Sequence, residues 1–406
     1  MREVGWMNGR PRRARLSAPI LSITLSWFLW GIGYYDYFAY LSPYMSSFVE
    51  PSRISLVYVA AGAASLAYPS AGLLSYRRLG VRGSISLWMA LAGLGIFLMG
   101  FSGGLAQFAL FLALNQSFYG ALPSYYASLA REEASYIPFV WALSVIPSFF
   151  MPTIGGVLAT RFGFKVLFAA SGALIASSAL PVALTSGLHA DEGTADVRGW
   201  ALAIPAMVPV ALESPYIFLV LERMYGMSNL QLGLVASIGE AIGMASALLL
   251  RRAKWGLSAA LAGFSLTALV AVSWAFGVAF GFWEAVVPLA IAYVSHGPEG
   301  APGVKFYASL TTLQALTFLS GYLLSTAVAS ANYMAVPAIG GFLSAALAAF
   351  YLIAGGGGRR RPLSPGASSW GIGAARRPRT ARRRPRTPRR SPARPTPRKG
   401  WASWPP

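Results

Sequence analysis

Three acidic residues lie inside long apolar stretches of this sequence, and they are the side chains best suited to carry out chemistry. Asp36, Glu213 and Glu240 each fall within a run long enough to cross a bilayer as a helix. No Lys or Arg in the expected spans is placed to pair with them. Burial without a counter-charge disfavours the ionised carboxylate, so such a group can carry a proton or, when ionised, bind a cation. We therefore take these three acids as candidates for proton coupling.

Asp36 shares one helical face with Gly33, Tyr40, Pro43 and Tyr44, at spacings of three and four residues. This face combines a carboxyl group, two phenols and a proline that can loosen the backbone hydrogen bonds. We interpret it as the lining of a polar pathway. The alternative is an acid held against a neighbouring helix by hydrogen bonds.

The other acids have different surroundings. Glu213 comes just before Pro215, which can leave a carbonyl free beside the acid, as in the unwound helices that coordinate ions. Glu240 is flanked by small residues, so a hydrogen bond to a closely packed neighbouring helix is an equally good interpretation. Glu284 follows a tryptophan at the start of an expected helix, and we expect it at the membrane interface.

Polar residues at helical spacing predict a solute-binding cavity. Asn115, Tyr119 and Tyr126 share a face, as do Gln314 and its neighbouring threonines. Hydroxyls and amides suit a neutral or polyhydroxylated solute, and the lack of basic residues inside the spans argues against a strongly anionic one. The candidate cavity residues are Tyr40, Tyr44, Asn115, Tyr119, Tyr126, Tyr216 and Gln314.

The composition is that of a polytopic membrane protein. Of 406 residues, 55% are hydrophobic and only 11% are charged, about half the charged fraction of an ordinary soluble protein. Cysteine is absent, and the two histidines, His189 and His296, fall in predicted loops. No nucleotide-binding loop, metal cluster or nucleophile arrangement appears. We therefore expect no cofactor, no metal site and no enzymatic activity.

Twelve apolar spans are expected to position these side chains in an all-α fold. They cover about 18–41, 54–76, 83–101, 105–129, 136–159, 164–186, 201–223, 229–250, 256–280, 282–296, 304–329 and 332–354. The break between the ninth and tenth spans is expected at Phe280-Gly281-Phe282. A shift of 176 residues superposes the second span and its basic exit on the eighth, so the two halves form a weak internal repeat.

The chain therefore divides into five segments. These are a basic arm at 1–17, a six-helix bundle at 18–186, a linker at 187–199, a second six-helix bundle at 200–354 and a tail at 355–406. Clustered Arg and Lys in the arm, in the loops after spans two and eight and in the tail place these segments and both termini in the cytoplasm of a cell-membrane protein.

The tail carries fourteen Arg, one Lys and no acid. Its proline content and like charge predict disorder. It is suited to anionic lipid headgroups, at about 1 kcal/mol per basic residue near the membrane surface. The basic run has no interleaved aromatic residues, so we expect no specific nucleic-acid partner, and we expect the protein to be a monomer.

The segment Pro152-Thr153-Ile154-Gly155-Gly156, followed by Arg161, Gly163-Phe164-Lys165 and Phe168, resembles the junction of helices five and six in the major facilitator superfamily. The resemblance covers about residues 18–354 and implies two six-helix bundles that rock around a central cavity. It also implies that Asp36 is similar to the helix-one acid of proton-coupled sugar and organic-acid symporters in that family.

Two positions depart from the family pattern. The loop after helix two usually reads Gly-x-x-x-Asp-Arg-x-Gly-Arg-Arg, but alignment on Gly80 puts Arg77 in place of the acid and Arg78 in the following Arg position. Arg77, Arg78 and Gly80 are therefore the candidate conformational loop. Many members also carry an Arg inside helix four, where this chain has Asn115 and Gln116.

These features together predict a secondary active transporter, a proton-coupled symporter of a small organic solute. Its partners would be the solute, protons and the lipid bilayer. One alternative is an efflux antiporter for amphipathic compounds. The other is a membrane sensor derived from a transporter that no longer transports.

Overall fold

The computed structural model of the protein describes residues 17–132, 136–197, 204–250, 253, 255–295 and 302–356. Every regular element in these residues is a helix, which confirms the predicted all-α class. The described residues belong to one unit, Met1–Gly358. The N-terminal arm before residue 17, His296 and the Arg/Pro-rich tail from residue 357 lie outside the described residues.

The first half of this unit crosses the membrane six times. Its elements are α1 (Ala18–Tyr37), η1 (Phe38–Tyr40), α2 (Leu41–Met45), η2 (Pro51–Arg53), α3 (Ile54–Ser65), α4 (Tyr68–Met99), α5 (Leu105–Asn115), α6 (Phe118–Glu132), α7 (Tyr136–Val145), η3 (Ile146–Phe149), α8 (Met151–Ser177) and α9 (Ala179–Leu184). Gly80 (φ 69°) and Gly163 (φ 81°) interrupt α4 and α8 at a backbone conformation that glycine adopts without strain. Each of these two long helices therefore contributes to two spans.

The second half adds six more spans. Its elements are η4 (Ile204–Met207), α11 (Val208–Glu213), α12 (Ile217–Tyr225), α13 (Asn229–Leu250), α14 (Gly256–Phe264), η5 (Ser265–Ala271), α15 (Phe276–Phe280), α16 (Trp283–Ser295), α17 (Val304–Asn332), η6 (Tyr333–Ala335) and α18 (Val336–Gly356). Over the residues that the structure describes, the twelve spans form two six-helix bundles, as predicted, and α13 coincides with the predicted eighth span.

The predicted break between spans nine and ten is wrong. The chain leaves η5 at Ala271 and enters α15 at Phe276, so span ten begins earlier than Phe282. Gly281 is instead a close packing point inside the span, because a Cβ there would lie 2.0 Å from the backbone oxygen of Gly239 on α13. A residue that permits such close approach of two helices looks the same in the sequence as a loop residue.

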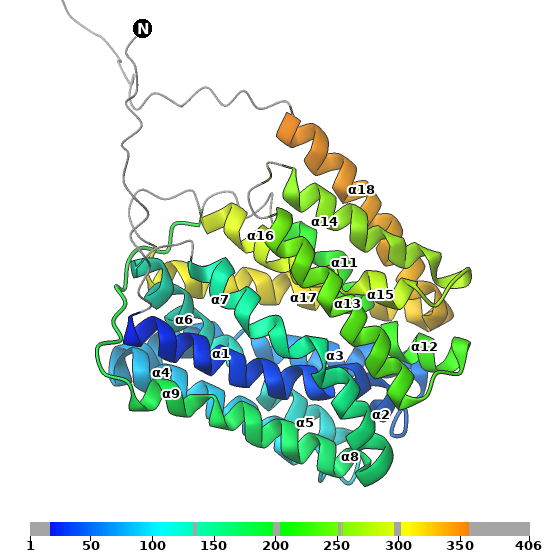
Figure 1. Cartoon of the computed structure of the whole chain (residues 1–406), viewed down its shortest axis with the longest axis horizontal. Helices are drawn as coiled ribbons and strands as arrows, with labels where there is room; N and C mark the ends of the chain where they lie inside the picture. Colours follow the sequence, from blue (N-terminus) through cyan, green and yellow to red (C-terminus); the bar gives the residue numbers. More distant parts are fainter. Residues whose placement is uncertain are drawn as a thin grey trace, which may run out of the picture. The chain divides into compact units, whose positions relative to one another are not determined.

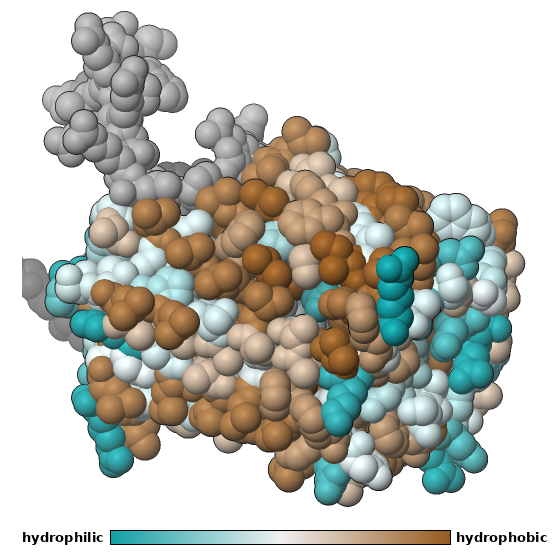
Figure 2. Space-filling view, turned by 60° about the horizontal axis from the view of Figure 1, so that its bottom comes forward, coloured by the Kyte–Doolittle hydropathy of each residue, from teal (hydrophilic) through white to brown (hydrophobic). Residues whose placement is uncertain are grey.

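The outer surface is that of a membrane protein. Six helical stretches of the described residues are long and apolar enough to span a bilayer; the two longest, Pro51–Met99 and Val304–Ile353, are more than twice the roughly 20 residues that one span needs. Large apolar side chains such as Leu249 (79% exposed) and Ile353 (76%) point outward. Hydrophobic residues dominate the face shown in Figure 2, and hydrophilic ones gather toward its edges. An apolar surface of this kind belongs in lipid, so the chain is a multi-pass membrane protein.

The two halves lie side by side in the helical unit (Figure 1), with α1, α4, α5, α8 and α9 in the lower part of the view and α14, α16 and α18 in the upper part. They meet in two main places. In one, α13 packs on α8, and in the other α17 packs on α3, α4 and α6. These seams enclose the space where the site lies.

Candidate functional site

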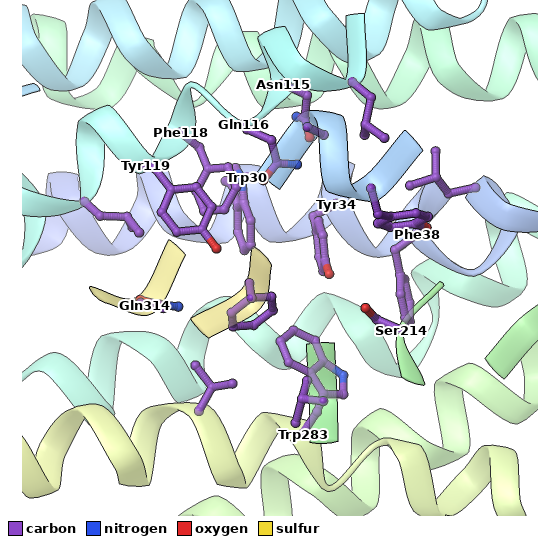
Figure 3. Close-up of a pocket in the computed structure, with 18 of the residues that line it drawn as sticks. Trp30, Tyr34, Phe38, Asn115, Gln116, Phe118, Tyr119, Ser214, Trp283 and Gln314 are labelled. Atoms are coloured by element: carbon purple, nitrogen blue, oxygen red, sulfur yellow. The ribbon is translucent and has the colours of Figure 1, made fainter. Parts of the chain in front are cut away.

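A cavity of about 170 Å³ lies between the two bundles and is lined by both. The first bundle contributes side chains from α1, α5 and α6, and the second from α11, α16 and α17 (Figure 3). Most of the lining is aromatic. The polar side chains that reach it include Asn115, Gln116, Ser214 and Gln314. Among the described residues no Asp, Glu, Lys or Arg lines the cavity.

An aromatic column forms the wall on α1. The ring of Tyr34 stacks on Trp30 at 4.8 Å and on Phe38 at 5.5 Å, with interplanar angles of 9° and 16°. The spacing of four residues brings successive side chains onto one helical face. Across the cavity, Trp283 of the second bundle meets Tyr34 edge-on at 6.3 Å. Because its two neighbours cover the faces of Tyr34, the column presents ring edges to the cavity, which suit edge-to-face contact with a ring-bearing solute.

Four of the predicted cavity residues line this space: Asn115, Tyr119, Tyr126 and Gln314. Asn115 is held in place because its side-chain amide donates to the carbonyl oxygen of Ala92, at 3.2 Å. The break between α5 and α6 at Gln116-Ser117 turns the amide of Gln116 toward the cavity as well. The amides therefore mark a polar side of an otherwise aromatic site.

The other three predicted cavity residues lie elsewhere: Tyr40, Tyr44 and Tyr216. The Tyr40 hydroxyl donates to the carbonyl oxygen of Pro152 on α8, and Tyr44 stacks on Phe164 at 4.7 Å. Tyr216 donates to Ser55 Oγ, at 3.1 Å, across the seam between the bundles. All three phenols thus have packing partners outside the cavity, which corrects their prediction as lining residues.

The predicted pathway face of α1 turns toward α8. A Cβ on Gly33 would lie 2.6 Å from the carbonyl oxygen of Ser171, and Ser171 Oγ donates to Asp36 Oδ2 at 2.9 Å. Asp36 is 1% exposed and does not line the cavity. The structure therefore fits the alternative interpretation, an acid hydrogen-bonded to a neighbouring helix of its own bundle. The cavity instead receives the face of α1 that carries Trp30, Tyr34 and Phe38.

Glu213 is also enclosed in its own bundle. Its side chain is fully buried, accepts a hydrogen bond from Thr267 Oγ1 at 2.8 Å, and fills the space beside Gly340 of α18. Like Asp36, it does not line the cavity. Neither Asp36 nor Glu213 therefore faces the cavity between the bundles in this arrangement of the helices.

Glu240 and Glu284 lie together beside the cavity, at the seam between the bundles. Trp283 Nε1 donates to Glu240 Oε1 at 2.8 Å, while Trp141 Nε1 donates to Glu284 Oε2 at 3.0 Å and the Tyr35 hydroxyl donates to Glu284 Oε1. Glu284 is 1% exposed, so its predicted interfacial position is wrong. The error follows from the misplaced break between spans nine and ten, which put a mid-span acid at a helix end.

The candidate conformational loop makes its ionic contact with the linker. Arg77 Nη2 lies 2.7 Å from Glu192 Oε1, and Lys305 Nζ at the start of α17 lies 2.7 Å from the same oxygen. Arg78 is exposed, and Gly80 forms the turn. We call Arg77, Glu192 and Lys305 the ionic clasp, since it ties the first bundle, the linker and the second bundle together. These two cations lower the pKa of the Glu192 carboxyl, Lys305 having the larger effect.

Glu192→Gln should open this end of the protein. The clasp is formed only while Glu192 is ionised, and a carboxyl whose pKa is lowered by folding loses its stabilising contribution as the pH falls through that lowered value. Acidification below the usual carboxyl range should therefore have the same effect as the substitution. Because the chain contains no cysteine, spin labels can be attached to cysteines placed at the exposed positions Arg78 and Trp255. Electron paramagnetic resonance should report a larger population of long distances between the two labels in the Glu192→Gln variant.

Asp191→Asn is the matched control, because this neighbouring acid is exposed and lies outside the clasp. It should leave the distance distribution unchanged. Equal effects of both substitutions would show that overall linker charge, rather than the clasp, sets the conformation.

No protein-family model and no curated protein sequence matches this chain. Among solved structures, a mutant of the nucleoside transporter NupG superposes with a TM-score of 0.62 at 12% identity, over 82% of this chain and 99% of that chain. A bacterial homologue of the human lysosomal transporter Spinster, inward-facing and occupied, gives 0.60 at 13% identity, over 85% and 97%. Its inward-facing, unoccupied form gives 0.59 at 14% identity, over 84% and 97%. The chain therefore has the major facilitator fold.

Proposed function

We propose that the protein is a secondary active transporter that moves a small, neutral organic solute across the cell membrane by alternating access, coupled to protons. The observation that carries the proposal is the cavity shared by the two bundles. A site built from both halves is reshaped whenever the halves rock against each other, and duplicated halves with a site between them are a recurrent transporter design. The structural neighbours, two of them captured inward-facing, support this proposal.

The cavity lining favours a solute with a planar ring and a few hydrogen-bonding groups. The ring edges of the column on α1 can contact a solute ring edge-to-face, and the amides of Asn115, Gln116 and Gln314 can bind hydroxyl or carbonyl groups. A charged group would find no counter-charge among the described lining residues. Nucleosides combine an aromatic base with hydroxyl groups, and a nucleoside transporter is among the structural neighbours, so they are the first compounds to test.

The strongly aromatic lining also favours the runner-up function, export of amphipathic compounds. Such a substrate would rely on the rings and make little use of the amides. Gln314→Leu distinguishes the two functions, because it should weaken binding of a polar, ring-bearing solute but leave binding of an amphipathic one unchanged. A thermal-stability screen of the purified protein against both compound classes identifies a ligand, and the effect of Gln314→Leu on the binding of that ligand can then be measured.

We further propose that both termini are cytoplasmic, with the ionic clasp on the same side. Arg77, Arg78 and Arg82 cluster at that end, whereas the basic residues of the opposite end, such as Arg53 and Arg161, occur singly. Single cysteines placed at Arg78 and Glu50, both exposed, should react with a membrane-impermeant reagent from opposite sides.

The transport proposal is tested in proteoliposomes loaded with and without a pH gradient. The gradient should drive accumulation of the solute found by the stability screen. Solute exchange without accumulation would show that transport is not coupled to protons. If neither exchange nor accumulation occurs, the alternative of a membrane sensor is favoured.

Tyr34→Leu should weaken solute binding about tenfold. Tyr34 is the middle ring of the aromatic column, and loss of an aromatic contact costs about 0.5–1.5 kcal/mol beyond buried area, where about 1.4 kcal/mol is a factor of ten. The expected change is in the KM of transport. Tyr44→Leu is the control, because this tyrosine lies outside the cavity and stacks on Phe164. Equal losses in the two variants would mean that the cavity is not the binding site.

A further inference from the structure

Two carboxyl groups that meet at the seam between the bundles have an arrangement unlike that of the other buried acids. Asp36 and Glu213 are each held by a hydroxyl of their own bundle. Glu240 on α13 and Glu284 on α16 belong to helices that pack together and interact with each other, and Glu284 takes donors from the opposite bundle. Both side chains are 1% exposed. We call Glu240 and Glu284 the carboxyl pair.

The four carboxyl oxygens show where a proton must reside. Glu284 Oε1 and Oε2 accept from Tyr35 and Trp141, and Glu240 Oε1 accepts from Trp283. Glu240 Oε2 is buried and meets no donor among the described residues. Two ionised carboxylates side by side would repel, and a neutral acid needs a partner for its own O–H. A proton on Glu240 Oε2, donated to Glu284, satisfies both requirements.

We propose that Glu240 and Glu284 share one proton, and that this carboxyl pair is the site that couples solute movement to protons. The inference rests on the transport function proposed above. The ligand of the carboxyl pair is the proton, which resides on a neutral Glu240 beside an ionised Glu284.

The position of the pair links its proton content to the conformation. Tyr35 and Trp141 belong to the first bundle, whereas both acids belong to the second. When the bundles separate along this seam, Glu284 loses two of its donors and meets water. A second proton then neutralises the uncompensated charge, and its release restores the ionised form that Tyr35 and Trp141 bind when the bundles close. Trp141 and Trp283 also line the cavity, so a bound solute touches the side chains that hold the pair.

Few other groups can titrate in its place. In the described part of the chain, the titratable side chains that interact with the pair are Tyr34 and Tyr35 on α1. On the elements packed against α13 and α16, the charged side chains are exposed or paired with each other: Arg161 and Lys165 on α8, and Glu222 and Arg223 on α12. Among the described residues, no base neutralises the pair.

Infrared spectroscopy of the purified, full-length protein tests the shared proton without a substrate, by following the absorbance of protonated carboxyl groups as the pH is varied. Glu240→Gln should remove the pair's share of the neutral-pH signal, seen in the difference between the spectra of parent and variant, because the amide introduced at this position can donate to Glu284, which then stays ionised. Glu284→Gln should have the opposite effect, leaving Glu240 with a single donor and a signal that persists as the pH rises. Glu213→Gln, a buried acid held within one bundle, is the control and should leave the titrating signal of the pair intact.

Glu240→Gln and Glu284→Gln should also lose proton-driven accumulation in proteoliposomes while solute exchange continues. A neutral-pH signal in Glu240→Gln as large as that of the parent would overturn the shared proton. If the infrared result holds but both variants accumulate solute like the parent, the pair is not the coupling site. A parent protein that moves no solute would contradict the transport function instead, and the infrared result would still decide whether the pair shares a proton.

Discussion

Joining Ser55 and Thr326 through a disulfide should abolish transport. Ser55 on α3 and Thr326 on α17 belong to different bundles, and their hydroxyl oxygens lie 2.9 Å apart. Alternating access requires the bundles to separate at each end in turn. A covalent link here would hold this end shut, so the solute could enter and leave only from the clasp end. Transport by Ser55→Cys/Thr326→Cys should fall to background on oxidation and return on reduction.

The chain supplies a closely matched control for this experiment. Ser75 and Ser84 lie 2.7 Å apart within the first bundle, on either side of the turn at Gly80. Ser75→Cys/Ser84→Cys forms a link of the same kind inside a body that moves as one, so its oxidation should leave transport unchanged. Because the natural sequence has no cysteine, no other thiol competes in either variant. Full transport by the oxidised cross-bundle variant would show that α3 and α17 do not separate.

The sequence predicted the number and order of spans because apolar length and turn residues are properties of the chain itself. The rotation of each span was harder to predict. On α1, the face with Gly33, Asp36 and Tyr40 appeared to be the functional one because it carried the acid. In the structure this face packs on α8, where Gly33 allows close approach and Ser171 satisfies Asp36. The repeat of Trp30, Tyr34 and Phe38 at every fourth residue was the available signal for the opposite face.

The carboxyl pair and the clasp depend on contacts between distant segments, which the sequence does not encode locally. Glu240 and Glu284 are 44 positions apart by their numbering, and their partners Tyr35 and Trp141 lie in the other half of the chain. The departure at Arg77 was visible in the sequence. Its ionic partner is an acid from the linker, Glu192. This pairing could not be predicted, because only the fold brings the linker beside α4 and α17.

Adjacent glycines in α8 should respond differently to the same substitution. A Cβ on Gly155 would lie 1.9 Å from the carbonyl oxygen of Asp36, inside the first bundle. A Cβ on Gly156 would lie 2.7 Å from the carbonyl oxygen of Asn229 and 2.8 Å from the Tyr40 hydroxyl. Asn229 begins α13 of the second bundle, whereas the buried Tyr40 hydroxyl belongs to the first bundle and donates to the Pro152 carbonyl oxygen. The clash at Gly155 is therefore permanent, whereas the part of the Gly156 clash that involves Asn229 exists only while α8 and α13 are together.

Gly155→Ala should accordingly destabilise every conformation, by about 1–3 kcal/mol, as overpacking of a closely packed contact does. Gly156→Ala should lower the melting temperature less than Gly155→Ala does, and it should favour the state open at this end. The helix-propensity gain of Gly→Ala is common to both positions and cancels in the comparison. Thermal melting measures the first effect, and spin labels on cysteines at the exposed positions Glu50 and Ser228 measure the second. If Gly156→Ala lowers the melting temperature as far as Gly155→Ala and leaves the label distances unchanged, the contact between α8 and α13 is a fixed part of the fold, and the bundles must move about another seam.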